Sequence, residues 1–207
     1  MLRDTGETPR ILAVPSTDLP LDARSSSVTP AGVVALVESA LRGDRVGWDG
    51  LFDRFHPVVY RYALARTGDR SAAEEIAQEV FVAATRTLPR LRERSEAGIE
   101  GWFVAIARNK LADRARRRSV EERMTLLHDS GPDAAEVATT RLAAAELRAA
   151  MEDITEEQRE VLLRRFVLDQ SLEHVAAATG RRVGAVKALQ HRALAALERR
   201  LGREWMA

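Results

Sequence analysis

The sequence predicts an all-α protein made of two small helical domains joined by a flexible linker. Ala, Leu, Arg and Glu dominate the 207 residues, and aromatic residues make up only 5% of them. Apolar residues recur at helical spacing, and no stretch of useful length alternates like a strand. We expect a disordered N-terminal tail over 1–27, a first domain over 28–118, a linker over 119–133 and a second domain over 134–203.

The composition excludes several classes of function. The chain has no cysteine, so it has no disulfide, thiolate zinc site or cysteine nucleophile. Its four histidines are scattered and no glycine-rich phosphate loop is present, so we expect no metal, no cofactor and no enzyme. Because no run approaches 18 apolar residues and no signal core is found, we expect a cytoplasmic protein without a membrane span.

Charge is segregated along the chain, although the formal net charge is only +1. Segment 98–118 has six basic and two acidic side chains, and segment 181–203 has seven and one. Segment 133–160 has eight acidic and three basic side chains. A solvated helix surface would explain one basic segment, but two of them favour nucleic-acid binding.

The first domain is expected to begin at Thr29-Pro30, a cap followed by proline at the first helical position. A short helix from there should end at Gly43. A second helix is expected over about 47–67, with six apolar residues at helical spacing, and Pro57 can bend it.

The third predicted helix, about 71–88, has two different sides. One is an apolar stripe for the core, and the other carries Glu75, Gln78 and Glu79. An acidic, hydrogen-bonding stripe on a rigid helix suits a basic helical partner and would steer its association. An ordinary solvated surface is the alternative for this helix alone.

A charged loop over 90–101 and a fourth helix over 101–118 are expected next. The helix should bury one apolar face, made of Phe103, Val104, Ala107, Leu111 and Ala115. Trp102, Asn109, Asp113 and Arg116 form another stripe. Trp102 could instead pack in the core with Ile106, and Asn109 could be a plain surface residue.

The second domain is expected to contain four helices, near 134–152, 156–168, 171–179 and 183–201. Thr155 and Gln158 have the spacing of a capping box, and Ser171 can cap the next helix.

The last two helices are typical of a DNA-binding helix-turn-helix. Ala176 leaves room for close packing, and Gly180 follows four residues later, where a positive φ is needed for the turn. A small core is expected from Val175, Val183, Val186 and Leu189. This arrangement leaves a basic, polar face that suits a major groove, made of Arg181, Arg182, Lys187, His191 and Arg192.

The order of these segments resembles that of bacterial sigma-70 superfamily RNA polymerase sigma factors, in particular the extracytoplasmic-function (ECF) group. AEEIAQEVF is similar to part of sigma region 2, WFVAIARN to its DNA-facing part, and GAVKALQHRAL to the reading helix of region 4. The resemblance covers about 50–201. It implies a cofactor-free subunit that binds core RNA polymerase, recognises the −35 and −10 promoter elements and promotes melting.

The resemblance also implies residue roles. Glu75, Gln78 and Glu79 would meet the β′ clamp coiled coil, and region 4 would meet the β flap. A flipped base of the −10 element would be captured by Asn109 and stacked near Trp102. The −10 DNA-binding set is Trp102, Phe103, Arg108, Asn109, Lys110, Arg114, Arg116 and Arg117, with Arg118 as a further phosphate contact.

For the −35 element, the resemblance places four residues in the major groove: Lys187, Ala188, His191 and Arg192. Arg181 and Arg182 would bind phosphate. The loop after the third helix departs from the family pattern, because it is longer and has Leu91 where an aromatic residue is common. An anti-sigma factor is an expected partner, since most of the family is held inactive by one.

Two other functions compete with this interpretation. A stand-alone helix-turn-helix transcription regulator would bind duplex DNA without polymerase, but it would need neither the acidic stripe nor the Trp-Asn-Arg stripe. An enzyme is the weaker alternative, because the histidines form no ligand set such as His-x-x-Glu-His.

Overall fold

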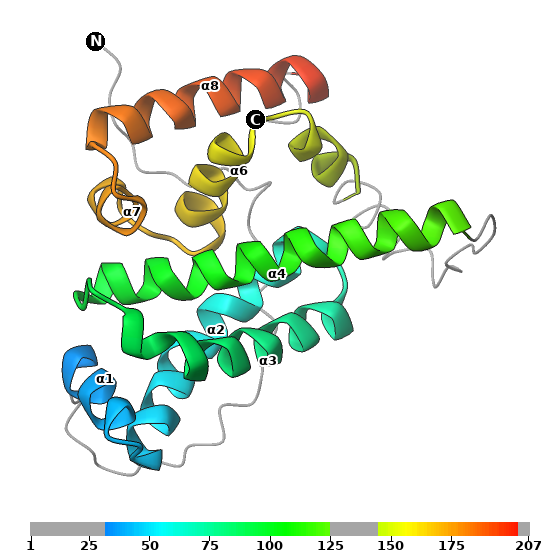
Figure 1. The fold of residues 1–207 in the computed structure, drawn as a ribbon. Helices are drawn as coiled ribbons and strands as arrows, with labels where there is room; N and C mark the ends of the chain where they lie inside the picture. The colour runs from blue at the N-terminus through cyan, green and yellow to red at the C-terminus, as the bar shows by residue number, and fades with distance from the viewer. Residues whose placement is uncertain (1–31, 125–144, 203–207) are drawn as a thin grey trace, which may run out of the picture.

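The structure, a computed structural model, describes residues 32–124 and 145–202 (Figure 1). Every regular element in these two ranges is helical, which confirms the all-α prediction. The elements form two helical units, and the long helix that crosses the molecule in Figure 1 belongs to the first unit and faces the second. The predicted cap at Thr29-Pro30 lies outside the described residues. The part of the predicted 134–152 helix that precedes residue 145 also lies outside them.

The first unit contains four α-helices and one short 3-10 helix. In chain order they are α1 (Val33–Leu41), α2 (Arg45–Thr67), α3 (Arg70–Thr87), η2 (Leu88–Arg90) and α4 (Glu96–Met124). Gly68 ends α2 at φ 68°, a left-handed conformation that glycine adopts at no steric cost. The Asp69 carboxylate then accepts a hydrogen bond from the Ala72 amide at 2.7 Å and caps α3.

Helix α4 is longer at both ends than the sequence analysis predicted. It begins at Glu96 because Ser95 caps it. The Ser95 hydroxyl oxygen accepts a hydrogen bond from the Gly98 amide at 3.1 Å. It continues to Met124, through the first six residues of the predicted linker, where Glu, Arg and Met are good helix formers. Ala115, predicted as core, is exposed.

The core of the first unit is built around stacked aromatic rings. Phe55 of α2 and Phe103 of α4 are 2% and 0% exposed, and their ring centroids lie 5.0 Å apart. Ile76 and Val80 of α3 close this core from the third side and are also buried. Each such side chain contributes about 1.5–3 kcal/mol through burial, so the apolar stripes hold α2, α3 and α4 at fixed orientations.

The second unit starts with a helical segment that ends at residue 152 and continues with four further elements. They are α6 (Glu156–Leu162), the π-helical turn η3 (Leu163–Val167), α7 (Leu172–Thr179) and α8 (Val183–Leu201). The predicted capping box of Thr155 and Gln158 is present. Ser171 also caps α7 as predicted: its hydroxyl oxygen accepts a hydrogen bond from the His174 amide at 3.0 Å.

Helices α7 and α8 form the predicted helix-turn-helix. Gly180 turns the chain at φ 65°. A separate small core joins α6, α7 and α8, consisting of Val161, Val175, Ala176, Val186 and Leu189, with Val183 partly buried beside it. Both the turn and this core confirm the sequence prediction.

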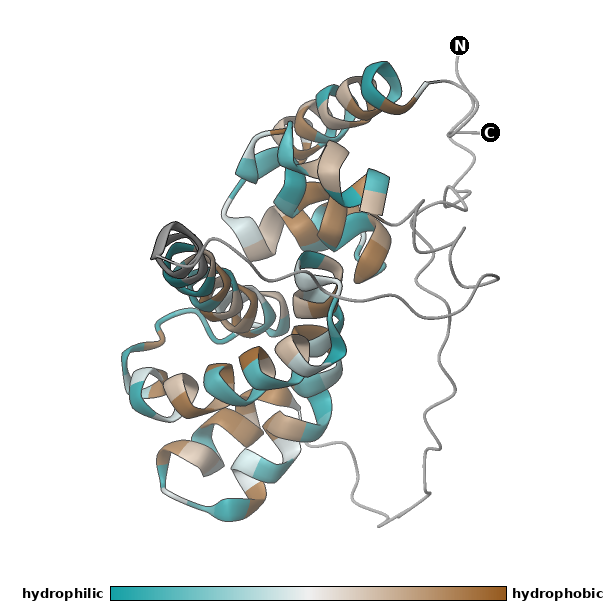
Figure 2. Ribbon diagram, turned by 90° about the vertical axis from the view of Figure 1, so that its right-hand side faces the viewer, coloured by the Kyte–Doolittle hydropathy of each residue, from teal (hydrophilic) through white to brown (hydrophobic). Residues whose placement is uncertain are grey.

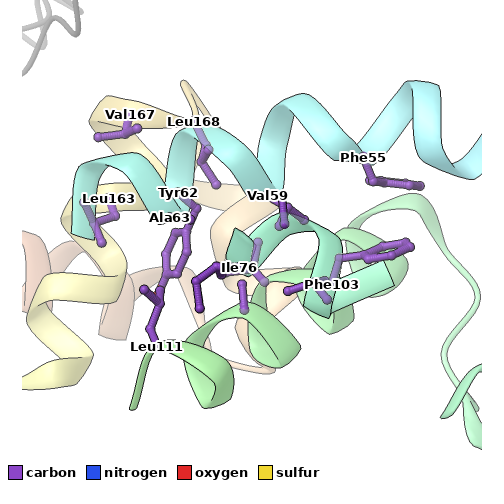
Figure 3. Packing of buried hydrophobic residues seen from close by; sticks show 14 of the residues in the cluster. Phe55, Val59, Tyr62, Ala63, Ile76, Phe103, Leu111, Leu163, Val167 and Leu168 are labelled. Carbon is purple, nitrogen blue, oxygen red and sulfur yellow. The ribbon is translucent and has the colours of Figure 1, made fainter. Parts of the chain in front are cut away.

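The two units pack directly on one another. Helix α7 lies against α4, and η3 lies against α2. One continuous apolar cluster runs from α1 to α8, and Figure 3 shows part of it. Figure 2 shows the two units from the side, with hydrophobic residues along the helices of both. The contact between the units joins residues far apart in the sequence, so helical spacing does not predict it.

Candidate nucleic-acid and protein interfaces

The acidic stripe of α3 lines a groove between α3 and α4. Glu75, Gln78 and Glu79 face this groove, and Val82, which is 56% exposed, also lines it. The groove has a volume of about 500 Å³, and its remaining lining consists of Ala83, Arg86, Thr87 and Lys110. A helix with one apolar and several basic side chains would be complementary to this surface.

Two cations of α4 reach across to the carboxylates of this stripe. Lys110 Nζ lies 3.1 Å from Glu79 Oε2, and Arg114 forms an ion pair with Glu75. These pairs join residues far apart in the sequence, so helical spacing along α3 does not reveal them. The stripe and two of the predicted phosphate-binding cations thus share one surface.

The predicted −10 surface lies along the exposed side of α4. Arg108, Asn109, Arg116 and Arg117 are all exposed, and Arg116 forms an ion pair with Asp113 of the same helix. Arg116 can turn toward a ligand, because neither partner of that pair is buried. The side chain of Arg118 lies outside the described residues.

The two aromatic residues at the start of this surface have different environments. Trp102 is partly buried and packs edge-on against Phe103, with ring centroids 4.8 Å apart. Ile106 is also partly buried against the same core, so the packing alternative for Trp102 holds in part. Phe103 is 0% exposed, so its ring is part of the core and supports Trp102. This burial contradicts its assignment as a DNA contact.

The loop that precedes α4 is short and is held by its own side chains. It spans 91–95, because Ser95 begins the helix earlier than predicted. The Glu93 carboxylate accepts a hydrogen bond from the Ser95 amide at 2.9 Å, and this hydrogen bond lowers the pKa of Glu93. Glu93 is therefore engaged in the turn, while Arg92 and Arg94 stay exposed beside the α4 surface.

The predicted −35 surface lies on α8. Val186, Leu189, Ala193 and Leu197 are buried, and this spacing turns the intervening residues to the opposite side of the helix. Six residues predicted to contact DNA are exposed there or at the preceding turn: Arg181, Arg182, Lys187, Ala188, His191 and Arg192. Arg181 also forms an ion pair with Glu157 of α6 at 2.6 Å.

Across 32–124 and 145–202 no group of three or more His, Asp or Glu side chains is placed to hold a metal ion. None of the helices described is both long and apolar enough to span a bilayer.

The helix-turn-helix and the two exposed cationic surfaces are typical of a helical, DNA-binding class of protein. Comparisons with known proteins agree with this class. The sigma-70 region 2 family matches residues 51–120, and the sigma-70 region 4 family matches residues 144–197.

Curated relatives carry the same assignment over most of the chain. The ECF RNA polymerase sigma factor SigD of Mycobacterium tuberculosis is 34% identical over 189 residues, covering 84% of this chain and 87% of SigD. ShbA of Streptomyces griseus, also an ECF sigma factor, is 33% identical over 178 residues, covering 79% and 92%. The chain therefore belongs to the ECF group of sigma-70 RNA polymerase sigma factors.

Two solved structures share the fold. CnrH, solved with the cytosolic domain of CnrY, matches with a TM-score of 0.57 at 23% identity, covering 81% of this chain and 96% of CnrH. RpoE of Bartonella quintana, solved with the anti-sigma factor NepR, matches with a TM-score of 0.53 at 20% identity, covering 75% and 96%.

Proposed function

We propose that this ECF sigma factor binds core RNA polymerase through the α3–α4 groove and reads the promoter through α4 and α8. One observation carries this proposal: three separate surfaces, one acidic and two cationic, stay exposed around a shared core. A stand-alone regulator would need only the α8 surface. The acidic groove therefore favours a subunit that brings a partner to DNA.

The α3–α4 groove is the proposed contact for the β′ clamp coiled coil. Basic side chains of that coil would take over Glu75 and Glu79 from Arg114 and Lys110, which would then be free to bind phosphate. Val82 adds an exposed apolar contact in the groove. The second unit would bind the β flap.

Helix α4 and the 91–95 loop are proposed to hold the −10 element and to favour its melting. Asn109 can hydrogen-bond the edge of a flipped base, and the partly buried Trp102 offers a stacking surface near it. Stacking of a base on an aromatic ring is worth about 1–3 kcal/mol, enough to offset much of the cost of unstacking. Arg108 and Arg117 would hold the adjacent phosphates.

Helix α8 is proposed to read the −35 element in the major groove. Lys187 and Arg192 can donate to guanine O6 and N7, which is worth about 1–3 kcal/mol of discrimination for each good pair. Arg181 and Arg182 would bind phosphate at the turn. Because both elements lie on one DNA, engaging the second is an intramolecular step, so neither surface has to bind tightly alone.

The proposal includes a regulatory partner and a place of action. CnrH and the Bartonella RpoE were each solved with a bound protein, and NepR is named as an anti-sigma factor. We propose that an anti-sigma factor also binds this chain. It would act in the cytoplasm beside core polymerase and contribute recognition, while the polymerase carries out the catalysis.

Run-off transcription with purified core polymerase tests this function. Core polymerase alone should give no specific transcript, and adding the chain should produce one from promoters that contain both elements. A chain that binds promoter DNA by itself but never redirects core polymerase would contradict the sigma assignment and favour the stand-alone regulator.

A further inference from the structure

The π-helical turn η3 joins α6 to the loop that precedes the helix-turn-helix. It contains two consecutive arginines, and the backbone amide of Leu168 donates to the Leu163 carbonyl oxygen at 3.0 Å to close it. Arg164 is 1% exposed, whereas Arg165 is half-buried. Single π-helical turns are rare and are found frequently at functional sites. The partners of the two arginines therefore indicate what this turn holds in place.

Both arginines contact Gln170, the residue directly before the Ser171 cap of α7. The backbone amide of Gln170 donates to the Arg164 carbonyl oxygen at 3.0 Å. Its backbone carbonyl oxygen accepts a hydrogen bond from Arg165 Nη1, and its side-chain Oε1 accepts one from Arg164 Nη1 at 3.4 Å. Asp169, the preceding residue, has φ 53°, a left-handed conformation in which aspartate is enriched. The chain therefore enters α7 from a position that η3 fixes.

Arg165 also reaches α8, the helix proposed to read the −35 element. Its Nε donates a hydrogen bond to Gln190 Oε1 at 3.2 Å, across 25 positions of the sequence. One guanidinium group thus joins the entry to α7 with the middle of α8. Arginine suits this role because its donors have a fixed planar geometry, whereas lysine has one compact charge on a flexible stem.

Gln190 lies beside the buried stripe of α8 and close to its exposed cations. Val186 and Ala193, one helical turn before and after it, are buried, and Gln190 itself is half-buried. With a rise of 1.5 Å per residue, Gln190 is about 4.5 Å from Lys187 and about 3 Å from Arg192 along the helix axis. A restraint at Gln190 therefore acts at the level of the proposed base contacts without replacing them.

The apolar packing of the helix-turn-helix does not by itself fix α8 to the precision that base contacts need. Its core consists of five buried residues, and apolar contact is non-directional. A hydrogen bond to a base edge requires a donor–acceptor distance of about 2.7–3.2 Å, so a shift of α8 by about 1 Å is enough to lose one. The directional hydrogen bonds of Arg165 supply the missing restraint.

We infer that Arg165 is a positioning residue for promoter recognition, which holds α7 and α8 in the relative placement that lets Lys187 and Arg192 reach base edges. The inference rests on the proposed reading of the −35 element by α8. Arg165 acts through Gln170 and Gln190 and contacts no base itself. Its loss should therefore lower discrimination between −35 sequences and leave the number of phosphate contacts unchanged.

Three substitutions test the inference in the full chain bound to core polymerase, on a promoter found by mapping the transcript starts that the parent chain directs. Arg165→Met removes the donors, Arg165→Lys keeps the charge without the planar geometry, and Gln190→Leu removes the acceptor. The measured quantity is the ratio of transcription with the intact −35 element to transcription with an altered one. Each variant should lower this ratio at least about fivefold, the lower limit for one good base contact.

Arg182→Met is the matched control, because Arg182 is an exposed arginine of the same motif with a proposed phosphate contact. It should keep the ratio and reduce the slope of log affinity against log salt concentration by about 0.9. Arg165→Met and Arg165→Lys should keep the parental slope. A parental ratio in Arg165→Lys, with a reduced slope in Arg165→Met, would identify a phosphate contact and overturn the inference.

Helicity measured by circular dichroism shows whether each variant is folded, and if Arg165→Met loses helicity, Arg165→Lys and Gln190→Leu carry the test. Parental ratios in the folded variants would overturn the positioning role and leave the sigma function intact. A parent protein whose transcription ignores the −35 sequence would instead contradict the proposed reading by α8, and the inference with it. The two failures are therefore distinguishable.

Discussion

At the scale of single residues, the Glu160–Arg164 pair is the most consequential interaction of the second unit. Arg164 is 1% exposed, and its Nε donates to Glu160 at 2.7 Å. A charge held this far from water is tolerated only while its partner is present. The pair therefore makes the fold sensitive to the loss of either side chain.

Glu160→Ala is expected to destabilise the protein by about 3–5 kcal/mol, because it leaves Arg164 buried and uncompensated. Denaturant unfolding followed by circular dichroism measures this change. Glu157→Ala is the matched control: Glu157 also pairs with an arginine, but its side chain is 59% exposed. That pair should be worth no more than about 1 kcal/mol. Equal losses in the two variants would contradict the burial argument.

Tyr62 links the stability of the folded protein to alkaline pH. Burial raises the pKa of its hydroxyl well above the ordinary value, and the neighbouring Glu160 raises it further. The folded protein thus holds this proton more tightly than the unfolded chain does. The resulting stability is complete below the unfolded pKa of about 10 and declines as pH rises above it.

The difference in unfolding free energy between the parent and Tyr62→Phe proteins should therefore shrink as pH rises past about 10. Phenylalanine keeps the ring but has no proton to lose, so the comparison cancels the titration of other groups. Unfolding free energies measured across this range give the answer. A difference that stays constant would show that the hydroxyl is not held as the structure places it.

At the scale of secondary-structure elements, α8 and α3 carry separable proposed tasks. Buried apolar residues fix which side of each helix faces out, so the exposed charges have defined directions. Substitutions on one helix should consequently leave the task of the other unchanged.

Lys187→Ala and Arg192→Ala are expected to weaken use of the −35 element without changing affinity for core polymerase. Each should cost about 1–3 kcal/mol of discrimination if the side chain contacts a base edge. Transcription from promoters with intact and altered −35 elements measures this. Arg199→Ala, a change of the same type in the last turn of α8, is the control and should have little effect. Loss of core affinity in the first two variants would contradict the division of tasks.

The paired substitution Glu75→Lys with Glu79→Lys should abolish recruitment of core polymerase. It reverses the charge of the groove and places two cations beside Lys110 and Arg114. Binding to immobilised core polymerase measures the effect. Glu38→Lys, on the exposed side of α1, is the control for an added positive charge. Normal recruitment by the paired variant would remove the groove as the polymerase contact.

The helices themselves were largely predictable because local signals define them. Apolar spacing gave the cores of α2, α3 and α8, and the Thr155 capping box and Gly180 marked element boundaries. Phe103 belongs both to the predicted apolar face and to the set that the resemblance assigns to DNA, and its burial agrees with the apolar spacing. The early start of α4 is harder to predict, because Ser95 caps a first turn that contains a glycine.

At the scale of the whole molecule, the contact between the units could not be predicted from the sequence. Tyr62 and Glu160 are 98 positions apart, and each taken alone has another ordinary explanation, as a core tyrosine and a surface glutamate. The sequence predicts Gly101 only as the start of a helix, but a Cβ atom there would lie 2.5 Å from the Ala178 carbonyl oxygen, so this glycine admits α7. Such long-range pairs leave no periodicity, so only the folded arrangement reveals them.

Mapping of transcript start sites after controlled expression tests the central claim most directly. The account predicts new starts that share two upstream elements at constant spacing, and it predicts that these starts disappear when the chain carries Glu75→Lys with Glu79→Lys. Starts that share no paired elements, or that persist with the reversed groove, would contradict it.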